Sequence, residues 1–310
     1  MTGSIRVYAP ATVANVAAGF DILGFAVHEP GDEVVARISS SPGVRITRVT
    51  GGDGSVPLDP AKNTAGVSVN RLLEANPQAG GIELELYKKM PCGSGLGSSA
   101  ASAVAAVVAA NEVLALKLSR EELLPFAMEA ERVACGTAHA DNAAPALMGG
   151  FVLIRSYQPL DLVRIPTPDE LFCAVVHPRI EIRTEDARRI LRSKITMQDA
   201  IVQWGNTAGL IAGLLKNDYG LIGRSLTDVI IEPARAILIP CFHQVKEAAL
   251  EAGALGCSIS GSGPSIFALS CGQEAAERSG TAMAAVYRKI GIECEVYVSD
   301  VNRKGAVVLD

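Results

Sequence analysis

The sequence predicts an α+β protein with two domains. Strand-like and helix-like patterns are mixed in both halves of the chain, and 310 residues suit two domains of roughly 150 residues each. A third observation is the Pro- and Asp-rich span 159–170, which is typical of a boundary between domains. We therefore expect one domain over residues 1–163 and a second over residues 164–310.

Strands are expected in the first half where polar and apolar residues alternate with a period of two. This alternation covers residues 4–9, 32–50 and 81–89. The Gly-Gly-Asp-Gly sequence at 51–54 predicts a turn directly after the second of these segments. Residues 65–75 predict a helix between the last two strands.

A loop, two helices and a strand complete the first half. The Gly/Ser-rich residues 91–99 predict the loop, and the Ala/Val run after it predicts a long helix that ends near residue 116. Ser119 and Glu122 form a capping box, which opens a second helix of about fifteen residues. The strand pattern resumes at residue 148.

The second half repeats the mixture of strands and helices. A strand is expected over residues 171–177. Helices are expected near residues 184–193, 197–215 and 241–252, and a last strand–helix–strand set ends at residues 293–301.

The composition excludes several classes of protein. A net charge of −5 without a long run of either sign argues against nucleic acid as a partner. The seven cysteines form no C-x-x-C pair and no H-E-x-x-H motif occurs, so free thiols are expected rather than a disulfide framework or a zinc site. The most apolar stretch, residues 100–110, is too short to span a bilayer, and the N-terminus lacks a secretory signal. We expect a cytoplasmic protein without a membrane partner.

The loop PCGSGLGSSAASA (residues 91–103) is the strongest chemical signal. Its glycines allow the backbone to approach an oxyanion closely, and the helix that follows presents unpaired N–H groups and a positive dipole end. It lacks the lysine of Walker A and reads G-x-G-x-G rather than G-x-G-x-x-G. The alternative is a tight turn without a ligand. The residues expected to bind a polyphosphate are Pro91, Gly93, Ser94, Gly95, Leu96, Gly97, Ser98, Ser99, Ala100 and Ala101.

Three segments resemble, in the same order, the three motifs of the GHMP kinase superfamily. These are APATVANVAAGFDILGFAV (residues 9–27), PCGSGLGSSAA (91–101) and CSISGSGPSIFAL (257–269). HADNAAPALMGGFVLI (139–154) and EPARAILIPCF (232–242) narrow the resemblance to the branch that phosphorylates L-homoserine. The resemblance implies an N-terminal domain like domain 2 of ribosomal protein S5, a ferredoxin-like C-terminal domain, and an active site between them.

The resemblance implies that ATP and Mg²⁺ are the cofactors and that the product is O-phospho-L-homoserine, on the way to threonine. Ser99 and Glu131 would hold Mg²⁺, with Ser98 near the phosphates. Glu129 is the competing residue, because either glutamate can be a solvated helix residue. Members of the family are often homodimers.

The resemblance also implies the substrate contacts. Asp21 would take the ammonium and Asn15 the hydroxyl of the substrate, while Arg188 and Arg235 would take its carboxylate. Thr184 is expected at a helix N-cap and near the reacting hydroxyl. Further contacts are expected from His139, Asp141 and Asn142, placed in a loop, and from Gly261 in a second glycine loop.

The chain departs from the superfamily at two places, of which the first concerns the mechanism and the second the local backbone. Mevalonate- and galactokinase-like members carry an aspartate as general base where this chain has Asn142, so we expect positioning and charge neutralisation to carry the chemistry. The Val-Ala-Ala of NVAAGFD replaces a turn that is richer in glycine in relatives.

Two alternatives remain open at this stage. One is a kinase of the same superfamily that acts on another alcohol such as mevalonate, although mevalonate has no ammonium for Asp21. The other is a sensing module without catalysis, for which a metal clamp of Ser99 and Glu131 would serve no purpose. Measuring the release of ADP with homoserine, with mevalonate and without an acceptor distinguishes a homoserine-phosphorylating enzyme from these two alternatives.

Overall fold

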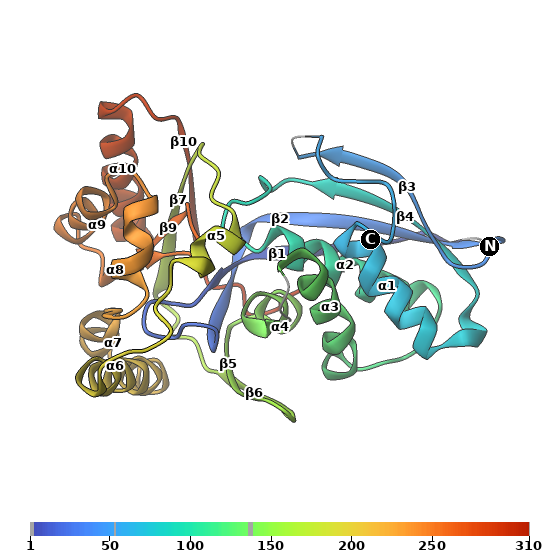
Figure 1. Cartoon of the computed structure of the whole chain (residues 1–310), viewed down its shortest axis with the longest axis horizontal. Coiled ribbons are helices and arrows are strands. Elements are labelled where there is room, and N and C mark those ends of the chain that lie inside the picture. Colours follow the sequence, from blue (N-terminus) through green and yellow to red (C-terminus); the bar gives the residue numbers. More distant parts are fainter. Residues whose placement is uncertain (1–2, 53, 136–138, 310) are drawn as a thin grey trace.

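The structure consists of two β-sheets side by side, each covered by helices (Figure 1). It is a computed structural model that describes residues 3–52, 54–135 and 139–309. The α+β class predicted from the sequence is confirmed. No helix among these residues is both long enough and apolar enough to cross a membrane, and the predicted cytoplasmic location stays a prediction.

The first sheet has seven strands. Its main path runs β11-β1-β2-β4-β3, β5 pairs with the first residues of β2, and β6 pairs with β5. Among the strands of residues 3–52, 54–135 and 139–309, only β3 and β4 are parallel neighbours. The strands are β1 (Ile5–Ala14), β2 (Leu23–Ser39), β3 (Val44–Gly51), β4 (Gly81–Lys88), β5 (Phe151–Tyr157), β6 (Leu160–Ile165) and β11 (Val307–Leu309).

The helices α1 (Thr64–Ala75), α2 (Ser98–Val113) and α4 (Ala140–Met148) pack against the first sheet, and α3 (Arg120–Cys135) packs on these three helices. Helix α2 lies at their centre, and its Ala and Val residues are buried on nearly every side. It ends three residues earlier than expected. The capping box of α3 is confirmed, because Ser119 N donates to Glu122 Oε2 (2.8 Å) and Glu122 N donates to Ser119 Oγ (3.3 Å).

The second sheet is antiparallel in the order β10-β7-β9-β8. Alternate residues of its strands face two cores: Val175 and Phe267 join the core of the first sheet, whereas Val176 and Ile266 pack under α9 and α10. Its strands are β7 (Leu171–Pro178), β8 (Gly256–Ile259), β9 (Ile266–Cys271) and β10 (Cys294–Asp300). The helices of this half are α5 (Thr184–Arg189), α6 (Met197–Lys216), α7 (Tyr219–Ser225), α8 (Glu232–Arg235), α9 (Phe242–Glu251) and α10 (Gln273–Lys289).

The change from one sheet to the other occurs between β6 and β7. Within the span 159–170, which resembles a domain boundary in sequence, residues 160–165 form the strand β6. The last strand, β11, returns to the first sheet and pairs with β1. The division at residues 163 and 164 stays a prediction.

Candidate active site

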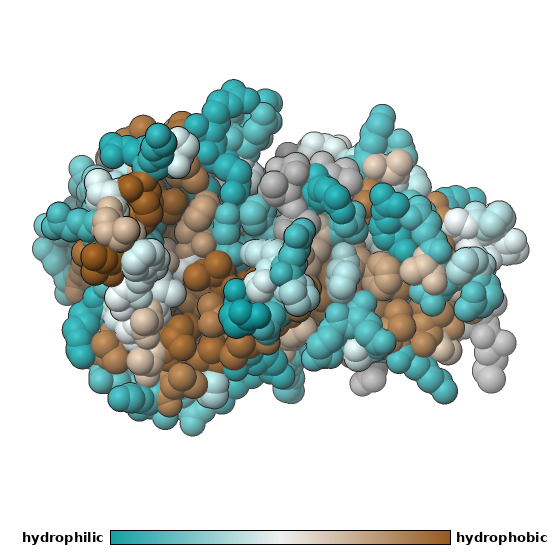
Figure 2. All heavy atoms as spheres, turned by 60° about the horizontal axis from the view of Figure 1, so that its bottom comes forward, coloured by the Kyte–Doolittle hydropathy of each residue, from teal (hydrophilic) through white to brown (hydrophobic). Residues whose placement is uncertain are grey.

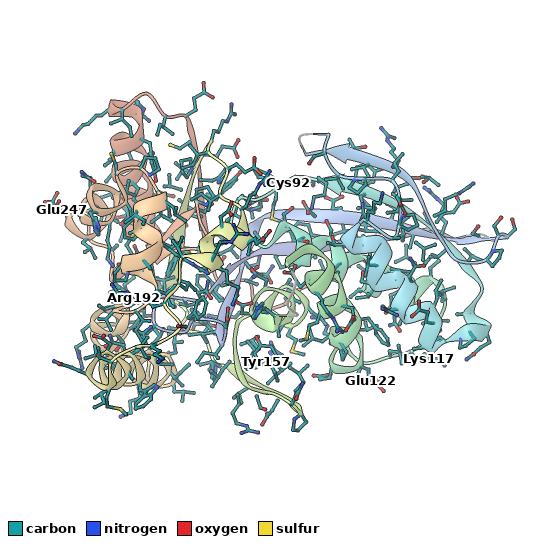
Figure 3. All side chains as sticks on the ribbon, viewed as in Figure 1. Cys92, Lys117, Glu122, Tyr157, Arg192 and Glu247 are labelled. Carbon is teal, nitrogen blue, oxygen red and sulfur yellow. The ribbon has the colours of Figure 1, made fainter. Side chains whose placement is uncertain are left out.

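A cavity of about 360 Å³ lies where the loops of the two halves meet. The glycine loop before α2 lines one side, and the second glycine loop lines another. Figure 3 shows Cys92, which belongs to the first loop, between the two halves. Predicted site residues from all three motifs line this cavity: Asn15, Asp21, Gly93, Ser94, Gly95, Gly97, Ser98, Ser99, Glu131, His139, Asp141, Asn142, Thr184, Arg188, Arg235 and Gly261.

The glycine loop is held in place by backbone contacts with both halves. Thr12 N donates to Leu96 O (3.0 Å) and Ser260 Oγ donates to Gly95 O (2.7 Å). A Cβ atom at Gly95 would lie 2.5 Å from the carbonyl oxygen of Ser260, and Gly95 has a φ of 76°. Gly95 is therefore required for packing against the second glycine loop, whatever ligand the loop binds.

Ser94 offers an unused hydroxyl to this cavity. The residue is 1% exposed, and its Oγ has no hydrogen-bond partner among the described residues. A buried hydroxyl without a partner costs about 1–3 kcal/mol, so such a group in a cavity wall indicates a ligand that supplies the partner. An anionic oxygen next to the start of α2 would satisfy it.

Lys88 and Asp32 form a buried ion pair beneath the start of α2, which the sequence analysis did not identify. The ammonium of Lys88 also donates to Ser98 O (3.0 Å) and to the hydroxyls of Ser98 and Ser102. Asp32 Oδ2 accepts from the same two hydroxyls, at 3.1 and 3.0 Å. The hydroxyl of Ser98 thus belongs to an internal network that fixes the first turn of α2.

We expect Lys88→Met to lower the free energy of unfolding by about 2 kcal/mol, because the Asp32 carboxylate loses its counter-ion inside the protein. The value lies below that of an isolated buried charge, because two hydroxyls and the N–H groups of Lys89 and Met90 still donate to Asp32. Urea titration measures the change. The double variant Lys88→Met/Asp32→Leu should recover part of the loss, and equal loss in both variants would contradict the ion-pair explanation.

The loop between β1 and β2 carries Asp21 in a strained backbone. Asn15, Val16 and Ala17 have φ angles of 71°, 35° and 56°, which are unusual for residues other than glycine. Asn15 holds this loop, because its Nδ2 donates to Gly261 O (2.7 Å) and its Oδ1 accepts from Asp21 N (3.0 Å). Its predicted contact with the substrate hydroxyl stays a prediction.

Asp21 and Arg188, predicted to bind opposite ends of a substrate, bind each other in this structure. Two parallel hydrogen bonds of 3.0 and 2.9 Å join their side chains. His139 Nδ1 lies 3.7 Å from Asp21 Oδ1, and burial lowers the pKa of His139. Phe20 lies under both arginines, with its ring centroid 5.4 Å from the guanidinium carbon of Arg188 and 5.0 Å from that of Arg235.

Arg235 is a buried cation in the cavity wall. It is 2% exposed, and its guanidinium donates to the carbonyl oxygens of Ala187 (3.2 Å) and Gly261 (2.9 Å). No carboxylate of the described residues lies within 4 Å of it. Burial, and then the charge of Arg188, lower its pKa to about 10. A buried guanidinium without a carboxylate partner provides a binding group for an anion that enters the cavity.

Two buried carboxylates, Glu131 and Asp141, lie on another side of the cavity. Burial, and then the charges of Asp21 and Glu131, raise the pKa of Asp141 to about 7. The structure therefore collects negative charge at the end of α3 and the start of α4. A cation in the cavity would relieve this repulsion.

The HADN segment was wrongly predicted to be a loop. His139 is the N-cap residue of α4, and Asp141 and Asn142 lie in its first turn. Thr12 Oγ1 donates to Asn142 Oδ1 (2.7 Å), so the Nδ2 group is the donor that Asn142 has left for a ligand. Gly97 makes this contact possible, because a Cβ there would lie 2.1 Å from Thr12 Oγ1.

The prediction that Thr184 is a helix N-cap was also wrong, by one position. It is the first residue of α5, and Arg183 occupies the N-cap position. The Thr184 hydroxyl instead shares a hydrogen bond of 3.2 Å with the hydroxyl of Ser262 in the second glycine loop. The side chain thus faces the cavity next to Arg188 and Gly261.

Sequence reasoning missed two further parts of the site. One is the cavity wall beyond the glycine loop, which includes Val56, Lys62, Asn63 and Thr64. The other is Tyr157 of β5, labelled in Figure 3, whose hydroxyl donates to Asp21 O (2.8 Å) and accepts from Ala140 N (3.2 Å). Neither part carries a local motif, because only the fold brings these residues to the site.

Comparison with known proteins assigns the fold. The family model described as "GHMP kinases N terminal domain" matches residues 63–150, and the model described as "GHMP kinases C terminal" matches residues 210–289. A crystal structure of homoserine kinase from Cytophaga hutchinsonii has a TM-score of 0.97 and 60% identity, and the match covers 100% of this chain and 98% of that chain. Leishmania major mevalonate kinase shares the fold, with a TM-score of 0.73 at 17% identity over 97% of each chain.

The curated relatives agree with the structural match. The homoserine kinase of Chlorobium phaeovibrioides is 54% identical over 99% of both chains. That of Xylella fastidiosa is 40% identical over 98% of this chain and 94% of its own. The predicted two-domain GHMP kinase fold is thus confirmed, and the chain belongs to the GHMP kinase family, in its homoserine kinase branch.

Proposed function

We propose that the protein transfers the terminal phosphoryl group of ATP to the hydroxyl of L-homoserine, giving O-phospho-L-homoserine and ADP. The observation that carries the proposal is the buried Arg235, which has no carboxylate partner among the described residues and lines the same cavity as Asp21 and the glycine loop. The cavity thus offers a cation and an anion to one small ligand and a polyphosphate site beside them. Homoserine carries the matching carboxylate, ammonium and hydroxyl.

The polyphosphate of ATP fits the glycine loop on three counts. The loop leads into the N-terminus of α2, and Gly93 of the loop lines the cavity. The buried hydroxyl of Ser94 has no hydrogen-bond partner among the described residues and can therefore bind a phosphate oxygen. The cavity continues past the loop to Val56, Asn63 and Thr64. We assign this extension to the nucleoside.

The donors in the cavity also fit Mg²⁺, which prefers hard oxygen ligands. Ser99 and Glu131 both line the cavity, and the repulsion felt by Asp141 indicates an excess of negative charge there. These two side chains would hold the ion, which, when bound, supplies positive charge against the oxygens of the transferring phosphoryl group.

The chain's own residues would orient the acceptor. The carboxylate would bind Arg235 and Arg188, and the ammonium would bind Asp21, with His139 and Asp141 nearby. A substrate with both charges can exchange partners with the Asp21–Arg188 pair without leaving either charge unpaired.

The reacting hydroxyl would lie near Thr184 and Asn142. The amide of Asn142 has a donor left for the hydroxyl oxygen and is not a base, so its role is to orient the acceptor. A loose phosphoryl-transfer transition state makes modest demands on base strength, which agrees with an asparagine at this position.

The proposal is tested by the release of ADP with three acceptors. We expect turnover with homoserine, turnover near background with mevalonate, and little ADP without an acceptor. Turnover with mevalonate would assign the protein to another substrate. Nucleotide binding without turnover on any alcohol would support a sensing module.

Gly93 offers the cleaner test of the phosphate loop. A Cβ at Gly93 would meet only Glu181 Cγ, at 3.7 Å, whereas a Cβ at Gly95 would collide with the second glycine loop. Both glycines have a positive φ (65° and 76°), so alanine strains the backbone at either position and the two variants differ in packing. We expect Gly93→Ala to weaken ATP affinity about tenfold, or about 1.4 kcal/mol, because the methyl group narrows the phosphate approach.

The matched variant Gly95→Ala should lower the melting temperature more than Gly93→Ala does, because it disturbs packing. Nucleotide titration and thermal melting measure the two effects. Unchanged ATP affinity in folded Gly93→Ala would contradict the proposal that this loop binds the phosphates of ATP.

A further inference from the structure

Helix α6 has an apolar outer face and an inner face that carries a buried amide. Ile201 and Trp204 are exposed (59% and 62%), and Figure 2 shows hydrophobic residues at the surface over the part of the molecule where α6 lies. Gln203 lies on the inner face with Leu210 and Leu214 and is 8% exposed. A buried amide needs partners for its N–H groups and its oxygen, so we expect Gln203 to bind other parts of the chain.

The amide of Gln203 is hydrogen-bonded at both its nitrogen and its oxygen, and its partners come from two separate segments. Nε2 donates to Ala18 O (3.3 Å), in the loop between β1 and β2, and to Asp228 Oδ1 (2.9 Å), in the segment before α8. Oε1 accepts from Val229 N (3.1 Å) in the same segment. Gln203 therefore joins the loop that carries Asp21 to the segment that leads to Arg235.

In the first segment, α6 holds a carbonyl group that lies three residues before Asp21. Ala18 O accepts from Thr207 Oγ1 (2.9 Å) as well as from Gln203 Nε2. Thr207 lies one turn after Gln203, so two side chains on one face of the helix fix the same carbonyl group. The position of Asp21 thus depends on α6.

In the second segment, the carboxylate of Asp228 fixes the start of α8. It accepts, at 2.9 Å each, from the backbone N–H groups of Ile230, Ile231 and Glu232. Arg235 is the last residue of this short helix, so the backbone that carries its guanidinium is held by Asp228. Because Gln203 binds the same carboxylate, α6 fixes the position of Arg235 too.

The two segments are also packed closely against each other behind the active site. The cavity between them measures about 10 Å³ and is lined by Asn15 and Ala17 of the first segment and by Asp228 and Arg235 of the second. Such a volume holds at most one water molecule. The spacing of the two segments therefore has little freedom while the contacts of Gln203 are intact.

This spacing determines how far apart the site holds its two binding charges. Asp21 and Arg235 line the active-site cavity, whereas Gln203 does not. In the proposed function they bind the ammonium and the carboxylate of homoserine, which are attached to one carbon atom. We propose that Gln203 is a positioning residue that fixes the spacing of Asp21 and Arg235, so that the site selects an acceptor with both charged groups on the same carbon. This role rests on the proposed function.

Gln203→Met tests this role, because methionine has about the length of glutamine and makes none of its hydrogen bonds. We expect the KM for homoserine to rise about tenfold, with kcat and the KM for ATP within about twofold, because only the spacing of the acceptor contacts changes. Ala18 O and Asp228 keep their other donors, so the variant should fold. Gln198→Met is the matched control, because Gln198 is exposed on the same helix, and its constants should equal those of the wild type.

A longer acceptor distinguishes a positioning role from general damage to the site. 3-Amino-5-hydroxypentanoate has one more CH₂ group than homoserine between its ammonium and its carboxylate, and the same spacing between ammonium and hydroxyl. The wild type should prefer homoserine by about tenfold or more in kcat/KM, and Gln203→Met should reduce this preference to within about threefold. A site that is merely destabilised would lose kcat/KM for both acceptors alike and keep the preference.

Thr207→Val provides a second and milder variant, because valine keeps the shape of threonine and removes one of the two donors to Ala18 O. Its KM for homoserine and its preference should lie between those of the wild type and Gln203→Met. A folded Gln203→Met with an unchanged KM for homoserine or an unchanged preference overturns the proposal. If Gln203→Met does not fold, an unchanged preference in Thr207→Val overturns it. Absence of turnover of homoserine by the wild type would instead reject the proposed function.

Discussion

Replacement of Glu131 by glutamine is expected to lower the catalytic constant by about two to three powers of ten and to leave the KM for homoserine within about twofold. The substitution keeps the shape of the side chain and removes its charge. Glu131 is 8% exposed and lines the same cavity as Ser99. If it holds Mg²⁺, the loss appears mainly in the transition state, where the phosphoryl charge is greatest.

Glu129→Gln is the matched control for this variant. Glu129 lies two residues earlier on α3 and forms an ion pair with Arg132 near the surface. We expect its turnover to stay close to that of the wild type. The concentration of Mg²⁺ that gives the half-maximal rate should rise in Glu131→Gln only. Near-normal turnover of Glu131→Gln would contradict a role in binding Mg²⁺ and would indicate that Glu131 is a structural residue.

A second readout of Glu131→Gln is the pH profile. The charge of Glu131 helps to raise the pKa of Asp141, after burial and the charge of Asp21. Removing that charge lowers the pKa of Asp141. If the charged form of Asp141 serves substrate binding, the acidic limb of kcat/KM moves to lower pH in Glu131→Gln and stays in place in Glu129→Gln.

The elements that the sequence predicted well have a strong local signal. The strand at residues 81–88 alternates polar and apolar residues with a period of two. The loop before α2 is rich in glycine and serine, a composition typical of loops rather than of helices or strands. The three motifs mark the loops that line the cavity, because each motif contains glycines or charged residues. Their meeting in one cavity follows from the fold.

The wrong element has a physical reason. Helix α4 is only nine residues long and buried along almost its whole length, and Pro145 within it looks like a break in a helix. The short strand β6 was hidden in the same way by prolines on both sides.

The buried position of Lys88 could have been predicted from the sequence, but the sequence analysis did not use the pattern that indicates it. Lys88 continues the buried register of Ile82, Leu84 and Leu86 on β4, so the alternation itself places its ammonium inside the protein. A lysine in that register requires a buried anion, which is Asp32 on β2. The Asp21–Arg188 pair had no such signal, because the two residues lie 167 positions apart.

Replacement of Arg235 by leucine is expected to raise the KM for homoserine by about one to two powers of ten, because a charged hydrogen bond contributes roughly 1.5–3 kcal/mol. The effect should exceed that of an exposed arginine, because Arg235 is 2% exposed and binds in a site with little water. ATP affinity should change little. Arg189→Leu, at an exposed arginine that pairs with Glu185, should leave both constants unchanged.

The structure adds a complication to this variant that a second acceptor resolves. Arg235 also donates to Ala187 O and Gly261 O, so leucine disturbs the loop as well as the ligand. With 3-aminopropan-1-ol, which is homoserine without its carboxylate, the wild type should lose most of its kcat/KM, whereas Arg235→Leu should lose much less. Only a contact between Arg235 and the carboxylate produces this crossover, because a disturbed loop weakens both acceptors alike. Equal losses, or a loss of ATP affinity instead, would show that homoserine does not lie with its carboxylate at Arg235.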